Sequence, residues 1–270
     1  MSEPRPPGHG LTAGYTVRQH LNRSNVYDVY AVWSTERDCL CIAKVLRPEL
    51  TGEKAAQERL LREGRRLTAF THPHLVRGYE VITTEAHTGP IIVTETLTGA
   101  TLSRLIQDSG SQGLSAADVA QLGLHLCSAL HYLHRHNLVH MDLKPSNIVC
   151  AAGKAILLDI DLAQPPGPCS PGMGTIEYMA PEQLAGASVD FSTDIWTLGG
   201  VLYRALTTHR PFPRSDGVRR IANNPDLTHL HRPGITPEFR DLITGCFAAT
   251  REERPSIGAV RQALDAILDG

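Results

Sequence analysis

Residues 140–147 read His140-Met141-Asp142-Leu143-Lys144-Pro145-Ser146-Asn147, and Asp159 follows twelve residues later. This segment brings carboxylates, an ammonium group and an amide close together along the chain. A carboxylate can orient a hydroxyl group, a cation can offset the charge of a transferring phosphate, and amide and carboxylate oxygens are ligands that magnesium accepts. The segment therefore supplies the polar groups that phosphoryl transfer from a magnesium nucleotide needs.

The same segment resembles the catalytic loop of the Ser/Thr protein kinases, H-R-D-x-K-P-x-x-N, and Asp159 resembles the first residue of their D-F-G motif. The resemblance extends over nearly the whole chain. It implies that Asp142 orients the acceptor hydroxyl and accepts its proton, that Lys144 lies beside the transferring phosphate, and that Asn147 and Asp159 hold the metal. It also implies ATP as cofactor with Mg²⁺, and Mn²⁺ as a second candidate metal. A loop ion pair is the structural alternative for Asp142 and Lys144.

Other residues resemble the nucleotide-binding part of a kinase. Lys44, in Cys41-Ile42-Ala43-Lys44, resembles the lysine of V-A-I-K, which contacts the α/β-phosphates and pairs with a helix glutamate, here Glu63. Thr94-Glu95-Thr96-Leu97 resembles the hinge, which implies that the backbone at Glu95 and Leu97 hydrogen-bonds adenine. The resemblance further implies that the adenine ring is sandwiched by the apolar residues Val29, Ala43 and Val149. Without it, these would be an exposed strand lysine and ordinary core residues.

A nine-residue segment further along resembles the end of a Ser/Thr-kinase activation segment: Gly174-Thr175-Ile176-Glu177-Tyr178-Met179-Ala180-Pro181-Glu182. In the family this segment forms the platform for a peptide around the acceptor residue. The resemblance implies that Thr175 hydrogen-bonds toward Asp142 and Lys144. It also implies a buried salt bridge between Glu182 and Arg254.

Hydrophobic patterning predicts strands in the first part of the chain and helices in the second. Short alternating or apolar runs predict five strands, at residues 15–21, 26–33, 39–45, 79–83 and 91–95. One helix, over about 53–70, interrupts them, with an apolar stripe at Leu60, Leu61 and Leu67. Beyond Gly99, Ser115 is a predicted N-cap, residues 193–207 form an apolar helix that carries Asp194 at its start, and terminal helices begin near Pro237 and Ser256.

The patterning and the resemblance together predict an α+β, bilobal, protein-kinase-like fold. Residues 1–13 are rich in proline and glycine without hydrophobic periodicity, which predicts a flexible tail. Residues 14–97 are expected to form a small N-lobe, with a five-stranded antiparallel sheet and one helix. Residues 98–270 are expected to form a larger, mainly helical C-lobe.

Composition narrows the classes of partner and compartment. The formal net charge of −2 gives no basis for binding nucleic acid. We find no apolar run of membrane-spanning length and no signal peptide, so we expect no membrane insertion and a cytoplasmic protein. The six cysteines are then expected to be reduced thiols.

Three departures from the kinase pattern bear on activity. The nucleotide loop, G-x-G-x-x-G-x-V in the family, is replaced over residues 22–29 by a segment without glycine, and Asp28 is expected to add negative charge near the phosphates. Asp159-Ile160-Asp161 replaces D-F-G, which predicts restrained movement of the motif and a shifted metal preference. Met141 replaces the arginine that pairs with a phosphorylated activation segment. This predicts that phosphorylation at Ser170, or elsewhere between Asp159 and Glu182, is not needed to order the site.

These observations favour a bacterial-type Ser/Thr protein kinase that transfers the γ-phosphoryl group of Mg·ATP to a hydroxyl of a protein substrate. The alternative is a pseudokinase that binds nucleotide or a partner protein without efficient transfer, and the glycine-free loop and Asp161 motivate it. A phosphotransferase acting on a small molecule or a peptide is a third interpretation. Retention of both Asp142 and Lys144 argues against a pure scaffold, because a binding module has no physical need for the pair.

Overall fold

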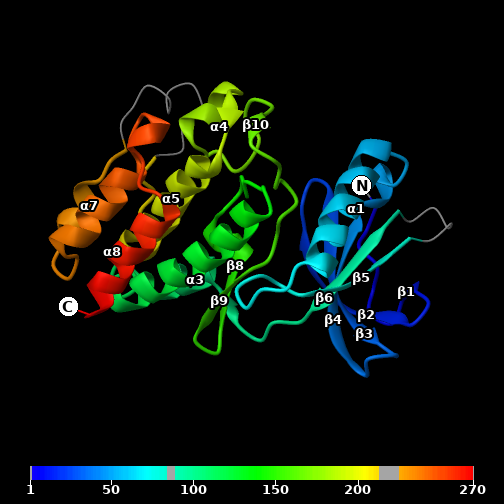
Figure 1. Cartoon of the computed structure of the whole chain (residues 1–270). Helices are drawn as coiled ribbons and strands as arrows, with labels where there is room; N and C mark the ends of the chain where they lie inside the picture. The colour runs from blue at the N-terminus through cyan, green and yellow to red at the C-terminus, as the bar shows by residue number, and fades with distance from the viewer. Residues whose placement is uncertain (1, 84–88, 213–224, 270) are drawn as a thin grey trace. The chain divides into compact units, whose positions relative to one another are not determined.

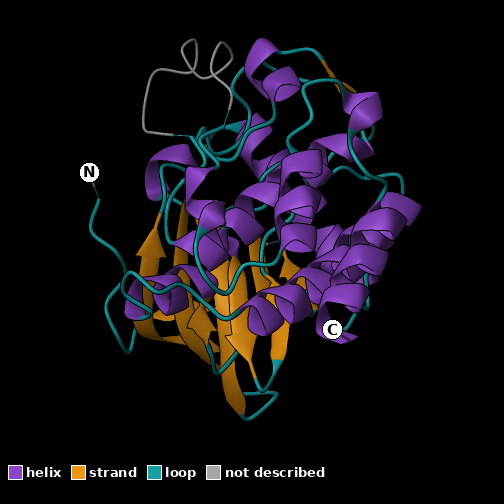
Figure 2. Cartoon of the chain, turned by 90° about the vertical axis from the view of Figure 1, so that its left-hand side faces the viewer, coloured by secondary structure: helices purple, strands orange, loops and turns teal. Residues whose placement is uncertain are grey.

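The structure, a computed structural model, describes residues 2–83, 89–212 and 225–269. The chain divides into two compact units, Met1–Thr98 and Gly99–Gly270 (Figure 1). The first unit contains an antiparallel sheet and one α-helix, and the second is mainly helical. Figure 2 shows the helices in purple and the strands in orange. The predicted α+β class, with an N-terminal sheet and a helical C-terminal part, is therefore confirmed.

The sheet of the first unit has six strands in the order β1-β2-β3-β4-β6-β5. All five strands predicted from the patterning are present, as β2 to β6. The strands are β1 (Gly10–Thr12), β2 (Tyr15–Arg23), β3 (Tyr27–Ser34), β4 (Cys39–Leu46), β5 (Gly78–Ile82) and β6 (Ile91–Glu95), and a 3₁₀-helix, η1, spans Pro48–Leu50. Successive side chains alternate between the two faces of a strand, so each strand contributes every second residue to the core.

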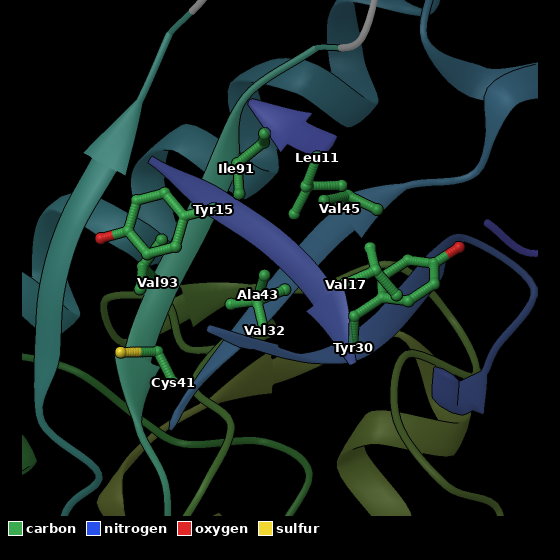
Figure 3. Close-up of a cluster of buried hydrophobic side chains, with 10 residues drawn as sticks. All are labelled: Leu11, Tyr15, Val17, Tyr30, Val32, Cys41, Ala43, Val45, Ile91 and Val93. Atoms are coloured by element: carbon green, nitrogen blue, oxygen red, sulfur yellow. The ribbon is translucent and has the colours of Figure 1, made fainter. Parts of the chain in front are cut away.

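One face of this sheet carries a buried apolar cluster (Figure 3). Val17, Val32 and Ala43 in its centre have no exposed surface. The members come from five strands: Leu11, Tyr15, Val17, Tyr30, Val32, Cys41, Ala43, Val45, Ile91 and Val93. Burying this many apolar side chains supplies the main driving force that holds the strands in register.

Helix α1 (Lys54–Ala69) packs against β4, β5 and β6, and it buries Leu60, Glu63 and Leu67. The approach to the sheet is close at Gly64, where an added Cβ would lie 2.5 Å from Val81 Cγ2. A small residue at this position therefore lets the helix reach the sheet, which brings Glu63 toward β4.

Part of the predicted tail is ordered, so the expectation of a flexible segment is wrong for residues 10–12. β1 pairs with β2 in an antiparallel register, and Gly8 N donates to Val17 O at 2.8 Å while Val17 N donates to His9 O at 2.9 Å. Leu11, which is 6% exposed, joins the apolar cluster. A single apolar side chain gave no periodic signal, yet backbone pairing with β2 is enough to hold it.

The second unit contains two small sheets and a set of packed helices. The sheets have the orders β7-β8-β9 and β10-β11. Their strands are β7 (Ala100–Thr101), β8 (Ile148–Ala151), β9 (Lys154–Leu157), β10 (Gly167–Pro168) and β11 (Ser188–Val189). The α-helices are α2 (Leu102–Asp108), α3 (Ala116–Arg135), α4 (Pro181–Ala185), α5 (Phe191–Thr207), α7 (Pro237–Cys246) and α8 (Ile257–Asp269), with 3₁₀-helices η2 (Pro145–Asn147), η3 (Thr228–His231) and η4 (Arg251–Glu253).

The helix starts agree with the sequence predictions. Ser115 caps α3, since its side chain accepts a hydrogen bond from Asp118 N, and α7 begins at Pro237. α3 packs against α5 and α8, and Gly123 permits this contact because a Cβ there would lie 2.7 Å from Leu264 Cδ1. These three helices form the frame from which the loop after α3 extends.

Candidate active site

Lys44 and Glu63 form an ion pair within the first unit, as the resemblance implied. Lys44 Nζ donates to Glu63 Oε2 at 2.8 Å and to Oε1 at 3.0 Å. The Glu63 side chain is 1% exposed and the Lys44 side chain 15%. A carboxylate buried to this extent requires a partner, so the pair fixes the ammonium group in one place.

Val29 and Lys44 lie on the same face of the sheet, but Ala43 lies on the other. Val29 is paired with Lys44 and Ala31 with Ile42 in the β3–β4 register, whereas Ala43 is paired with Tyr30 and belongs to the buried cluster (Figure 3). The prediction that Ala43 contacts adenine is therefore wrong. Because side chains alternate along a strand, the residue that shares a face with Lys44 is two positions before it, which is Ile42.

The hinge residues Glu95 and Leu97 are at and beyond the end of β6. The Glu95 amide is already used, because Glu95 N donates to Arg77 O at 3.0 Å, and Glu95 Oε1 accepts from Arg77 N at 2.9 Å. These two bonds hold the last residue of β6 to the chain before β5. Val149, in the second unit, lies on β8 and is 7% exposed.

Asp142, Lys144 and Thr175 are brought together in the second unit. Lys144 Nζ donates to Asp142 Oδ2 at 2.6 Å and to Thr175 Oγ1 at 2.7 Å. Asn147 Nδ2 donates to Asp142 O at 3.3 Å. Asp142 Oδ1 is buried and has no hydrogen-bond partner among the described residues. The ammonium group of Lys144 thus links the catalytic loop to the activation segment, and one carboxylate oxygen of Asp142 is left to accept a proton.

Asn147 lies opposite Leu158, the residue before Asp159, at the end of the β8–β9 hairpin. Leu158 N donates to Asn147 O at 2.9 Å, and Ile148 is paired with Leu157. Since Asn147 uses its amide nitrogen on Asp142, its amide oxygen is the atom left for a metal. An amide oxygen and a carboxylate form the kind of oxygen donor set that Mg²⁺ prefers when phosphates complete its shell. The described residues contain no group of three or more His, Cys, Asp or Glu side chains that could hold a metal ion.

The residues after Asp159 form a short turn. Asp161 N donates to Asp159 Oδ1 at 2.8 Å, and Ile160 between them is fully buried. The turn therefore orients the Asp159 carboxylate through a backbone bond. Ile160 occupies an apolar position, as expected for the residue that replaces phenylalanine.

Asp194, at the start of α5, holds the backbone of the catalytic loop, a role that the sequence analysis did not assign. Its side chain is fully buried. Asp194 Oδ2 accepts from His140 N at 2.8 Å and hydrogen-bonds His134 Nε2 at 2.8 Å, while Oδ1 accepts from Met141 N at 3.1 Å. The available signal was an acidic residue in the first turn of an otherwise apolar helix.

Met141 has a left-handed backbone, with φ = 75°, which is uncommon for a residue other than glycine. Its N–H is bound by Asp194, and its carbonyl accepts from Gln183 Nε2 at 2.8 Å. Its side chain, 1% exposed, packs with Val139 and Val189. The position that carries arginine in the family is thus held by backbone hydrogen bonds and apolar packing.

The activation segment is held near Met141 by a shared side-chain hydrogen-bonding partner, Gln183, and by apolar packing. Gln183 Nε2 also donates to Met173 O at 2.9 Å, and Leu162, Cys169 and Met173 pack against the cluster around Met141. β10, within the segment, pairs with β11. These contacts tie the segment to the residues around Met141 and to β11.

Glu182 and Arg254 form the predicted salt bridge. Arg254 Nη1 donates to Glu182 Oε1 at 2.7 Å and Arg254 Nη2 to Oε2 at 3.0 Å, and Thr193 Oγ1 adds a bond to Oε1 at 2.8 Å. The Arg254 guanidinium also lies 4.9 Å from the centroid of the Trp196 ring. The pair is bidentate and buried, which are the conditions under which removing one partner is costly.

The glycine-free loop has an ordinary backbone, because none of residues 22–28 has a positive φ. Asp28 is 1% exposed and is bound by Arg23 Nε at 2.7 Å, Arg23 Nη2 at 2.8 Å and His20 Nε2 at 2.9 Å. Burial alone would raise the pKa of Asp28, but the hydrogen bonds from Arg23 and His20 outweigh burial and lower it. The negative charge that Asp28 was expected to add near the phosphates is thus compensated by Arg23 and His20 within the sheet.

Comparison with known proteins identifies the family. The family model of the protein kinase domain matches residues 15–265. A probable serine/threonine-protein kinase of Streptomyces coelicolor is 29% identical over all of this chain and 42% of its own length. The serine/threonine-protein kinase PknB of Mycobacterium tuberculosis is 28% identical over 95% of this chain and 43% of its own, and a probable PknB of Bifidobacterium longum is 30% identical over 89% and 37%.

The chain spans about two fifths of the length of these relatives. Among the described residues, no helix is both long enough and apolar enough to span a membrane. The match over residues 15–265, together with a sheet-bearing first unit and a helical second unit, shows that this chain belongs to the protein kinase domain family.

Proposed function

We propose that this chain is a Ser/Thr protein kinase domain that transfers the γ-phosphoryl group of ATP to a hydroxyl of a protein. The observation that carries the proposal is the arrangement of Asp142, Lys144 and Thr175, in which one ammonium group links the catalytic carboxylate to the activation segment. The similarity to PknB-type kinases supports the same activity.

The residues of the second unit have distinct roles in the proposed reaction. The acceptor hydroxyl oxygen bonds to the γ-phosphorus, the bond to the oxygen that bridges to the β-phosphate breaks, and ADP leaves. Asp142 Oδ1 orients the hydroxyl and takes its proton, while Lys144 keeps the other carboxylate oxygen fixed and offsets charge on the transferring group.

Two further pairs bind the nucleotide and the metal. Lys44, held by Glu63, contacts the α/β-phosphates. Asn147 and Asp159 supply oxygens to Mg²⁺, or to Mn²⁺, and the metal when bound neutralises charge on the phosphates. Val29 and Ile42 on one face of the first sheet, the backbone at Glu95 and Leu97, and Val149 are the proposed adenine contacts.

The test is transfer of label from γ-labelled ATP to the protein itself and to a basic-protein acceptor, with Mg²⁺ and separately with Mn²⁺. Asp142→Asn removes the proton acceptor and Lys44→Met removes the phosphate contact, so both variants should lose transfer. Asp190→Asn, which changes a half-buried carboxylate at the start of α5, is the matched control and should transfer normally.

The second candidate is a pseudokinase, and the position of Tyr27 favours it. The ring of Tyr27 lies over Lys44 Nζ, 4.4 Å from its centroid, where a family glycine would leave space. Nucleotide binding without transfer of the γ-phosphoryl group, with Mg²⁺ or with Mn²⁺, would support this candidate and reject the kinase proposal.

A further inference from the structure

Tyr27 occupies the position of the third glycine in the family's nucleotide loop, two residues before Val29. Its side chain is buried, and the ammonium group of Lys44 lies 4.4 Å from its ring centroid. The same ammonium group donates to both oxygens of Glu63. Lys44 is therefore enclosed by a carboxylate on one side and an aromatic face on another.

The backbone of Tyr27 is fixed by the turn before it. Ser24 N donates to Tyr27 O at 2.8 Å, and Ser24 Oγ accepts from Tyr27 N at 2.9 Å. Val26 O, one residue earlier, accepts from Arg47 N at 2.9 Å at the end of β4.

On the other side, Tyr27 is followed by Asp28, the buried carboxylate that Arg23 binds with two nitrogens. A bidentate, charge-assisted pair of this kind resists rotation of the backbone next to it. The position of the ring over Lys44 is therefore fixed by hydrogen bonds on both sides of Tyr27 in the β2–β3 hairpin.

A phosphate oxygen and the Tyr27 ring would both interact with the ammonium group of Lys44. A lysine ammonium group has three N–H donors, and the two Glu63 oxygens take two of them. An aromatic face attracts a cation through its quadrupole, and that attraction is stronger where water is excluded, as it is at this buried ring. A phosphate that approaches Lys44 from the side of the ring would therefore have to displace the ring from the ammonium group.

We propose that Tyr27 sets the nucleotide affinity of this domain by competing with the α/β-phosphates for Lys44. The proposal deepens the function proposed above and rests on it, because it takes Lys44 as the phosphate contact. It predicts that Tyr27 weakens the binding of every ligand that carries those phosphates. It also predicts that Tyr27 does not weaken the binding of a ligand that lacks them.

The experiment compares binding of ADP and of adenosine by titration calorimetry, in the wild-type protein and in three variants of Tyr27. Tyr27→Leu keeps apolar bulk but removes the π face, and we expect ADP to bind about fivefold more tightly, as loss of one cation–π contact implies. Adenosine should bind with unchanged affinity. Tyr27→Phe keeps the ring and removes the hydroxyl, so it should match the wild type with both ligands.

Tyr27→Gly restores the residue of the family pattern and should also bind ADP more tightly. If this variant unfolds, the comparison of Tyr27→Leu with Tyr27→Phe still decides the question. Equal or weaker ADP binding in a folded Tyr27→Leu variant overturns the proposal, and so does a gain for adenosine equal to the gain for ADP.

These titrations need no phosphoryl transfer, which separates this proposal from the proposed function. The ADP effect should persist when Tyr27→Leu is combined with Asp142→Asn. Absence of transfer in the wild type, with the ADP effect intact, counts against the kinase function alone. Failure of every variant to bind ADP overturns both.

Discussion

Replacement of Asp194 by asparagine tests whether one buried carboxylate holds the catalytic loop. In either orientation of the new amide, its NH₂ group faces the backbone N–H of His140 or of Met141. That N–H group then lies buried without an acceptor, which costs about 1–3 kcal/mol, and the remaining bonds lose the strength that a charged acceptor gives. We expect the free energy of unfolding to fall by about 3 kcal/mol, as measured by urea denaturation.

The activity should change in a specific way. The left-handed backbone of Met141 is itself unfavourable by about 1–3 kcal/mol, so it should relax when its N–H loses an acceptor and should move the adjacent Asp142. We expect the kcat for phosphoryl transfer to fall at least about tenfold, the effect of about 1.4 kcal/mol in the barrier. The dissociation constant of ADP, measured without added metal, should change much less than kcat, because its assigned phosphate contact, Lys44, belongs to the other unit and the metal ligands of the second unit are then not used.

Asp190→Asn provides the matched control for this change. It alters the same functional group four residues earlier, where asparagine remains a good N-cap, and the ion pair that it weakens, with Arg251, is partly exposed. Its stability should stay within about 0.5 kcal/mol of wild type. An Asp194→Asn protein with the stability and the kcat of this control would refute the role given to Asp194.

Three other predictions follow from the same structure. Glu182→Ala should lower the free energy of unfolding by about 3–5 kcal/mol, because it leaves the buried Arg254 guanidinium unpaired; a loss below 1 kcal/mol in thermal unfolding would contradict this. Ser170→Ala should retain wild-type transfer rates, and a folded but inactive variant would show that phosphorylation orders the segment after all. Asp28 has a lowered pKa in the folded protein, so its contribution to stability is present above the unfolded pKa of about 4 and is lost as the pH falls through the folded pKa. The stability difference between wild type and Asp28→Asn should therefore shrink below about pH 4 in acid titrations followed by circular dichroism.

The elements predicted most accurately were those with many residues in one repeating pattern. The apolar spacing along residues 116–135 and the cap at Ser115 required only local information, because both depend on contacts within one helix. The pairing of Lys44 with Glu63 was likewise predictable, since a family pattern fixes which strand and which helix carry them.

Other features depend on contacts between distant residues. Asp194 lies 54 residues from His140, and Gln183 lies 42 residues from Met141, so no local pattern could show these bonds. Ala43 was misplaced by one residue, which in a strand is enough to move a side chain to the opposite face. The compensation of the Asp28 charge was not predictable, because its partners Arg23 and His20 become neighbours only once β2 and β3 pair.

Strand β1 has a practical consequence for how this protein is produced. The family match begins at Tyr15, so a version of the chain trimmed to that match would lose Leu11 and the bonds that Gly8 and His9 make with Val17. The first residues of β2, Tyr15 to Val17, would then become an uncovered stretch of sheet edge with free N–H and C=O groups. Such edges recruit strands from other molecules, so the trimmed protein should aggregate during purification while the full chain remains monodisperse.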